Sequence, residues 1–222
     1  MREIDLFPLW LSLRVAALST VVVVVAGVGL GWLLARKKFF GREALDALVT
    51  LPLVMPPTVL GYYLLVLLGR TGFVGRLFES FTGQQLVFTW RGAVVAAAAG
   101  ALPLVVKTAR ASFAAVDTQY EEAARTLGKS EWEVFRRVTL PLASRGILAA
   151  AMLAFARALG DFGATLMVAG NIPGRTQTAA IAIYDAAQAG RDADALTLVV
   201  ILSVVAFTFL YATNRLTAAG AR

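Results

Sequence analysis

Residues Glu121 to Pro141 have the sequence EEAARTLGKSEWEVFRRVTLP and contain Gly128-Lys129-Ser130, the triplet that closes a nucleotide-binding P-loop. A P-loop also needs a glycine five positions before that glycine, because a Cβ there would block the amides that wrap the phosphates. That position is Ala123, and the preceding residues favour a helix rather than a buried strand. We therefore do not expect this chain to bind ATP itself.

The composition of the whole chain indicates a membrane protein. Of its 222 residues 59% are hydrophobic and 16% are charged, and the mean hydropathy is +0.73. Soluble domains are roughly 45–50% apolar and about 25% charged. Cysteine and histidine are absent, which removes disulfides, thiol nucleophiles and the usual general base. The net charge of +7 comes from basic residues between apolar stretches, where a membrane explains it better than nucleic acid does.

The apolar stretches predict an all-α membrane protein with about five spanning helices, because a span needs about 20 mainly apolar residues. Residues 4–13 are too few to cross and would form at most an interfacial or re-entrant helix. We expect a single domain over 10–214. Its spans are predicted at about 12–35, 46–69, 88–108, 145–170 and 195–214, with a cytoplasmic segment over 110–145.

The distribution of Lys and Arg predicts the orientation of the spans. Thirteen of the 21 basic residues lie in the first inter-span loop, in the segment 107–145 and in the C-terminal tail. Since cytoplasmic segments carry the excess of basic residues, the N-terminus is predicted outside and the C-terminus in the cytoplasm. The start of the chain has acidic residues and no small-residue cleavage site, so we expect the first span to be retained.

Capping signals predict a first short helix within the cytoplasmic segment. Asp117 or Thr118 can begin it, and Glu121 stands three residues after Thr118 as a capping-box partner. Gly128 is placed to end this helix. The glycine of the apparent P-loop is thus predicted to be a helix stop.

A second short helix is predicted to follow at once. Ser130 can cap its start with Glu133 as capping-box partner, and we expect Pro141 to end it. Trp132 and Phe135 recur at helical spacing and would make a good anchor for a partner protein if exposed. The alternative is that this segment folds back and packs on its own bundle.

The segment also resembles a known family. Glu122-Ala123-Ala124, Gly128, Val138 and Leu140-Pro141 match the spacing of the E-A-A-x-x-x-G signature of importer-type ABC permeases, with valine where isoleucine is commonest. The resemblance implies the type I importer permease fold and a coupling helix pair that docks on a separate ATPase subunit. ATP and Mg would bind there and not to this chain. The implied interface residues are Glu122, Ala123, Ala124, Leu127, Gly128, Lys129, Trp132, Leu140 and Pro141.

Two further segments resemble molybdate permeases: LPLVMPPTVLGYY at 51–63 and GDFGATLMVAGNIPGRT at 160–176. The resemblance implies a multi-pass subunit of the bacterial inner membrane that moves molybdate, with sulfate and tungstate as near alternatives. Its implied partners are two copies of an ATPase subunit and an extracytoplasmic oxyanion-binding protein. Five spans are too few to enclose a sizeable path, so we also expect a homodimer with the passage on its two-fold axis.

Two groups of residues are candidates for the translocation path or its gate. Pro52, Pro56 and Pro57 remove backbone donors from the second span and predict a kink near mid-membrane, beside Thr58. Arg157 and Asp161, four residues apart in the fourth span, would either form a bundle-locking salt bridge or line the path, with Arg157 offsetting the charge of a passing anion. The path candidates are Pro56, Pro57, Thr58, Arg157 and Asp161.

The loop over 171–194 contains a predicted short helix from about Thr178 to Ala189. It is exposed on the side where a binding protein would dock, and Arg175, Asp185 and Arg191 are the candidate contacts. A loop that only covers the bundle is the alternative.

Two other classes of function are weaker fits. An ion-coupled secondary transporter would want more ionisable residues in its spans and an inverted repeat, and the sequence has one charged pair and no repeat. An intramembrane enzyme without histidine and cysteine would depend on a Ser/Lys scheme, to which no pattern points.

Overall fold

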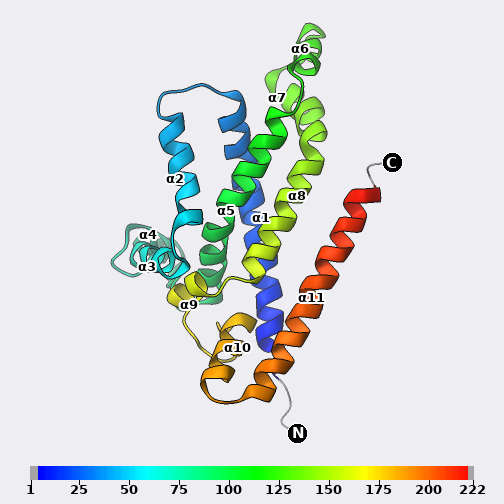
Figure 1. The fold of residues 1–222 in the computed structure, drawn as a ribbon. Helices are drawn as coiled ribbons and strands as arrows, with labels where there is room; N and C mark the ends of the chain where they lie inside the picture. Colours follow the sequence, from blue (N-terminus) through cyan, green and yellow to red (C-terminus); the bar gives the residue numbers. More distant parts are fainter. Residues whose placement is uncertain (1–4, 220–222) are drawn as a thin grey trace.

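The computed structural model describes residues 5–219, and the regular structure over these residues is helical (Figure 1). Within residues 5–219, four helices are long and apolar enough to cross a membrane, and a fifth candidate is a helix pair bent by 117°. The four are α1 (Phe7–Arg36), α5 (Trp90–Ala114), the continuous helix Glu131–Leu159 that includes α8 (Leu140–Leu159), and α11 (Asp192–Ala219); the pair is α2 (Arg42–Val54) and α3 (Pro57–Leu68). The prediction of an all-α protein is confirmed.

Shorter elements connect the long helices. They are α4 (Phe73–Thr82), α6 (Thr118–Thr126), α7 (Glu131–Val134), the π-helical turn η1 (Phe135–Thr139), α9 (Gly163–Ala169) and α10 (Ala179–Gln188). Figure 1 shows α6 and α7 at one end of the bundle, toward which the C-terminal end of α11 also points. The start of α1 and α10 lie at the opposite end. The first and last described helices therefore place the two ends of the chain at opposite ends of the bundle, as predicted. The side of the membrane that each end faces stays a prediction.

Small residues let α1 and α5 approach closely. A Cβ added at Gly27 would lie 2.7 Å from Val105 Cγ1, and one added at Gly31 would lie 2.8 Å from the Ala109 Cβ. Both distances are shorter than carbon atoms tolerate. Without a hydrophobic force between helices in lipid, close backbone approach and dispersion contacts hold the pair together. The α1–α5 contact is therefore the centre of the bundle, and α8 packs on both helices.

The second predicted span is broken, as its prolines predict. Helix α2 ends at Val54, and Met55 and Pro56 are extended, with ψ of 139° and 137°. A residue before proline is biased away from the helical region, so two consecutive prolines end the helix and let α3 begin at Pro57 in a new direction. The span predicted over 46–69 is thus a bent pair rather than one straight crossing.

The fourth span differs from its prediction at both ends. Pro141 does not stop the second short helix, because the π-helical turn before it closes a wider ring, from Leu140 N–H to Phe135 C=O, and makes room for the proline. The helix then ends at Leu159, so Asp161 lies in a break before α9 and not in the middle of a helix over 145–170.

The first helix begins earlier than predicted. Helix α1 is continuous from Phe7, where Pro8 occupies a first-turn position that needs no N–H donor. Residues 7–13 therefore belong to the first long helix, and the described residues before them, 5 and 6, are not helical, so no separate interfacial helix forms over residues 5–13.

Matched glycine substitutions in α1 test this packing. Gly31→Ala is expected to destabilise the protein by about 1–3 kcal/mol, because its Cβ would overlap α5. Gly29 has nothing within 4 Å of an added Cβ, so Gly29→Ala is expected to be neutral or stabilising through helix propensity. The check is the thermal unfolding temperature of each purified variant in detergent. Equal unfolding temperatures for the two variants would contradict the close α1–α5 contact.

Candidate functional site: the coupling segment and the helix breaks

The turn between α6 and α7 is built from local hydrogen bonds. Asp117 caps α6 by accepting from the Gln119 N–H. At the other end Gly128 has φ +77°, its N–H donates to Arg125 C=O, and the Lys129 N–H donates to Ala124 C=O. These two bonds form a Schellman motif, which needs a left-handed residue and favours glycine. The predicted helix stop at Gly128 is confirmed.

The start of α7 carries the second predicted cap. Ser130 Oγ accepts from the Glu133 N–H, and the Glu133 side chain accepts from the Ser130 N–H, which completes a capping box. Lys129 pairs with Glu133 at 3.4 Å. Lysine and serine of the apparent P-loop are therefore occupied in a helix hinge.

The surface of this hinge is apolar where it meets solvent. Leu127 is 79% exposed and Trp132 is 67% exposed. Exposed large apolar side chains beside small ones are typical of a partner-binding surface. Of the nine predicted interface residues, Ala124 and Leu140 are half-buried and the following are exposed: Glu122, Ala123, Leu127, Gly128, Lys129, Trp132 and Pro141.

Phe135 differs from its predicted role. Its ring packs inward against Trp32 and Phe113, with centroids 5.4 Å and 6.2 Å apart. It also stacks on Trp132 at 5.7 Å. Phe135 therefore holds the exposed tryptophan in place and belongs to the core.

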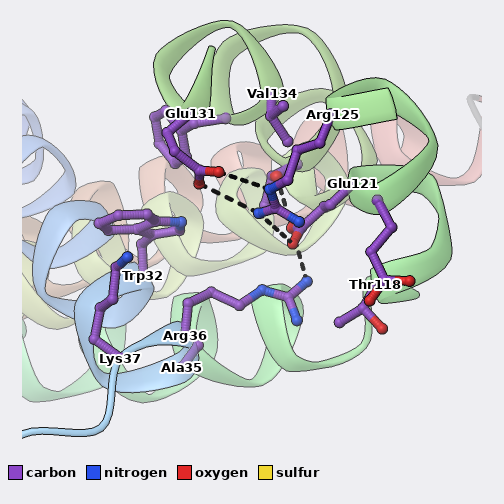
Figure 2. A pocket seen from close by; sticks show the side chains of 12 residues that line it. Trp32, Ala35, Arg36, Lys37, Thr118, Glu121, Arg125, Glu131 and Val134 are labelled. Carbon is purple, nitrogen blue, oxygen red and sulfur yellow. Dashed lines mark hydrogen bonds and ion pairs between the residues drawn. The ribbon is translucent and has the colours of Figure 1, made fainter. Parts of the chain in front are cut away.

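A buried carboxylate lies behind the hinge (Figure 2). Glu121 is 5% exposed, and its Oε1 lies 3.0 Å from Arg36 Nη2 and accepts from the Thr139 hydroxyl at 2.7 Å. The expected capping-box role of Glu121 is therefore wrong, because the side chain turns toward α1 and η1. Local spacing along the chain could not reveal this, since both partners are remote in sequence.

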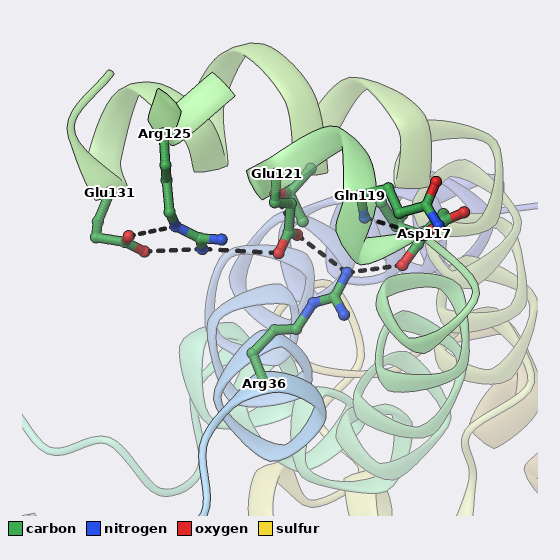
Figure 3. A network of polar contacts seen from close by, with 8 residues as sticks. Arg36, Asp117, Gln119, Glu121, Arg125 and Glu131 are labelled. Carbon is green, nitrogen blue, oxygen red and sulfur yellow. Dashed lines mark hydrogen bonds and ion pairs between the residues drawn. The ribbon is translucent and has the colours of Figure 1, made fainter. Parts of the chain in front are cut away.

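Further charges extend this cluster toward the surface. Arg125 lies 3.8 Å from Glu121 and donates to Glu131 at 2.6 Å, so that opposite charges alternate from Arg36 to Glu131 (Figure 3). The hydrogen bond to Glu131 raises the pKa of the Arg125 guanidinium above its ordinary value. The same hydrogen bond holds the pKa of the Glu131 carboxyl below its ordinary value, so both partners are charged at neutral pH.

The two helix breaks come together. An open hollow of about 480 Å³ is lined by four of the five path candidates, Pro57, Thr58, Arg157 and Asp161, while Pro56 is exposed next to them. Arg157 Nη1 donates to Asp161 Oδ1 at 2.9 Å, and Asp161 Oδ2 accepts from the N–H and hydroxyl of Thr165. The salt bridge of the first alternative is thus present, and Arg157 still lines the hollow.

Glycine makes room for this arginine. A Cβ at Gly100 of α5 would lie 3.2 Å from Arg157 Nη2. The side chain of Asp161 is 1% exposed and that of Arg157 is 31% exposed. The carboxylate is therefore held inside the protein, while the arginine side chain is partly exposed and lines the hollow.

The three predicted docking residues lie in two places. Asp185 pairs with Arg191 at 2.8 Å and accepts from the Asn171 amide, at the edge of α10. Arg175 lines a separate hollow of about 520 Å³ together with Arg14 and Arg91. The structure does not bring the three residues together.

Comparisons with known proteins agree with this architecture. Residues 27–215 match the family described as "Binding-protein-dependent transport system inner membrane component". The molybdenum transport system permease protein ModB of Escherichia coli (strain K12) is 44% identical over 90% of this chain and 88% of that protein. A putative molybdenum transport system permease protein of Bacillus subtilis is 44% identical over 92% of this chain and 90% of that protein.

Two weaker similarities complete the comparison. A sulfate transport system permease protein of Salmonella typhimurium is 37% identical over 78% of this chain and 62% of that protein. A chain of the MetNI methionine ABC transporter, in an inward-facing crystal form, superimposes with a TM-score of 0.75 at 19% identity, over 99% of this chain and 97% of that chain. The second similarity shows the fold alone.

The chain therefore belongs to the family of inner membrane components of binding-protein-dependent transport systems. It has the type I ABC importer permease fold. It is a transport subunit, and in such systems ATP hydrolysis belongs to a separate subunit.

The Schellman turn makes Gly128 testable by itself. A Cβ there has nothing within 4 Å, so the cost of Gly128→Ala is only that of a left-handed alanine, about 1–2 kcal/mol. Gly128→Asn is expected to cost less, because asparagine tolerates this conformation. Hydrogen exchange of the amides at 128 and 129, followed by mass spectrometry, should be faster in the alanine variant than in the asparagine variant. Unchanged exchange in both would contradict the motif.

Proposed function

We propose that this chain is the membrane-spanning subunit of an ATP-driven importer for molybdate, working by alternating access. The observation that carries the proposal is the exposed hinge of α6 and α7, a surface of small residues with Leu127 and Trp132 beside them. The 44% identity to permeases named for molybdenum transport favours molybdate over sulfate, for which the identity is 37%. Tungstate stays an alternative cargo, since it is also a tetrahedral dianion.

The hinge docks on an ATPase subunit, one for each copy of this chain. Ala123 and Gly128 allow close backbone approach, Leu127 and Trp132 supply buried apolar area, and Glu122 and Lys129 form a charged rim. When the two ATPase subunits bind ATP, they close on each other. This closure brings together the coupling helices of the two copies of this chain and opens the passage to the outside. Two capped helix ends keep the shape of the docking surface fixed without the partner, which reduces the entropy lost on binding.

The anion passes over the hollow between the helix breaks. Arg157 offers a partly exposed positive charge, and its salt bridge to Asp161 lowers the net charge of the site. A partly neutralised arginine attracts a dianion without trapping it. High-affinity selection then belongs to the extracytoplasmic binding protein, which docks at the opposite end of the bundle beside Arg175, Asp185 and Arg191.

A second copy of the chain completes the passage. The hollow at Arg157 is open and is lined by the first two residues of α3, Pro57 and Thr58. Farther along α3, Val59 and Tyr62 are 41% and 57% exposed. One protomer therefore provides one wall of the path. A homodimer with the two hollows facing each other supplies the opposite wall and two ATPase docking sites.

Docking is tested by Ala123→Asp, which buries a carboxylate in the expected interface. The variant should lose co-purification with the ATPase subunit by at least tenfold while the membrane subunit itself stays folded, because Ala123 is exposed in the free chain. Ala189→Asp, an exposed alanine at the other end, is the matched control and should bind normally. A complex of unchanged yield with Ala123→Asp would argue strongly against this docking surface.

The path is tested at Arg157 in vesicles that contain the whole transporter. Arg157→Gln keeps a donor for Asp161 but loses the charge, and molybdate uptake is expected to fall at least tenfold. Arg157→Lys keeps both the charge and a donor and should retain most of the uptake. Metal analysis of the vesicle contents measures both, with ATPase assembly checked in parallel. Uptake by Arg157→Gln at the wild-type rate would limit Arg157 to a structural role.

A further inference from the structure

We propose that Glu121 is a positioning residue that joins the coupling helix α6 to the end of α1, so that a displacement of α6 is transmitted to the transmembrane bundle. The inference rests on the proposed function, because it assigns a role in coupling to a contact behind the docking surface. Glu121 is outside the E-A-A triplet itself and points away from the docking surface.

Three elements, α1, α6 and η1, meet on this one carboxylate. Figure 3 shows its contacts with Arg36 and Arg125. Arg36 is the last residue of α1 and lies 3.0 Å from Glu121 Oε1, and Thr139 of η1 donates to the same oxygen at 2.7 Å. The glutamate itself belongs to the first turn of α6. The carboxylate therefore ties the coupling helix to two separate parts of the bundle.

Burial makes this tie stiff. The side chain of Glu121 is 7% exposed and that of Arg36 is 16% exposed, so water screens their attraction far less than it screens a surface pair. Separating them would leave a charge buried without a partner, which is strongly unfavourable. The contact therefore resists separation when α6 is pushed.

The guanidinium of Arg36 does not satisfy all of its hydrogen-bond donors in this geometry. Its Nη2 also donates to Val116 C=O, in the link between α5 and α6, while its Nε is buried with no partner among residues 5–219. A buried unpaired donor is costly. Arg36 thus leaves Nε unpaired while Nη2 contacts both the α6 carboxylate and the α5–α6 link. This geometry does not maximise the number of hydrogen bonds, and it is better explained if Arg36 serves to position α6.

Without this carboxylate α6 would have few ways to reach α1. Its packing is mainly on α7 and η1, which continue into α8. The π-helical turn carries motion along α8, whereas Arg36 is the route to α1 at the centre of the bundle. Removing the tie should therefore leave ATP-driven motion of the hinge but reduce what reaches the α1–α5 pair.

The test is a double variant, Arg36→Met with Glu121→Met, in the complete transporter with its ATPase and binding protein. Replacing a buried ion pair by apolar side chains of similar volume is often neutral for folding, so the protein should assemble. We expect ATP hydrolysis within about twofold of wild type and an increase of at least fivefold in ATP hydrolysed per molybdate imported. The matched control is Arg70→Met with Glu79→Met, an exposed pair 3.9 Å apart outside the hinge, which should leave the ratio unchanged.

Two results would overturn the inference. One is a double variant that imports molybdate at the wild-type ratio. The other is a double variant in which assembly, ATP hydrolysis and import fall together, since that would mean a role in folding alone. A wild-type chain that binds no ATPase subunit would instead contradict the proposed function, so the two failures are distinguishable.

Discussion

The hydrocarbon region contains no water to satisfy a free backbone N–H or C=O, and this constraint determines where the helices of this chain can break. The bent pair breaks at Pro56 and Pro57, which have no N–H to leave unpaired. The break after α8 is closed by Asp161, which accepts from the Thr165 backbone and hydroxyl. Each break therefore avoids an unpaired backbone N–H in a different way. The prolines remove the N–H donors at the first break, and Asp161 supplies an acceptor at the second.

The two breaks also pack on each other, and glycines make this possible. A Cβ on Gly61 of α3 would lie 2.7 Å from Met167 Cβ of α9, and one on Gly163 would lie 3.0 Å from Pro57 Cβ. Side chains at either position would push α3 and α9 apart and expose the broken backbone. The hollow beside Arg157 lies where the two breaks meet, with Pro57 and Thr58 of one break and Gly160 to Gly163 of the other among its lining residues.

Features that depend on neighbouring residues could be predicted from the sequence, and those that depend on remote ones could not. The Schellman turn at Gly128 and the capping box at Ser130 follow from residues three to five positions apart. The proline break follows from a dipeptide. By contrast, Glu121 satisfies the local pattern of a capping box but bonds to Arg36 and Thr139, which only the fold brings near.

The wrong stop at Pro141 has a related cause. Proline ends a regular α-helix because its ring meets the carbonyl one turn earlier, and that rule assumes a ladder of constant pitch. The π-helical turn over Phe135–Thr139 changes the pitch immediately before the proline. Nothing in the local sequence marks such a turn. Its first residue, Phe135, packs inward against Trp32 and Phe113, which are remote in the sequence. The π-helical turn thus lets the helix continue through the predicted stop.

This continuity changes the mechanics of the coupling segment. A helix that stopped at Pro141 would transmit force to the fourth span through a flexible link. The observed helix is instead continuous from Glu131 to Leu159 and runs from the exposed Trp132 to the edge of the hollow at Arg157. Force applied at the hinge would therefore have a rigid route to the proposed anion path. The long helix alone can tilt without moving its neighbours. The effect of its tilt on a gate depends on whether the neighbouring helices move with it or stay in place. In the proposed role, the second attachment, from Glu121 to Arg36 of α1, makes the centre of the bundle move with the coupling segment. Without this attachment the helix from Glu131 to Leu159 would move and α1 would stay in place.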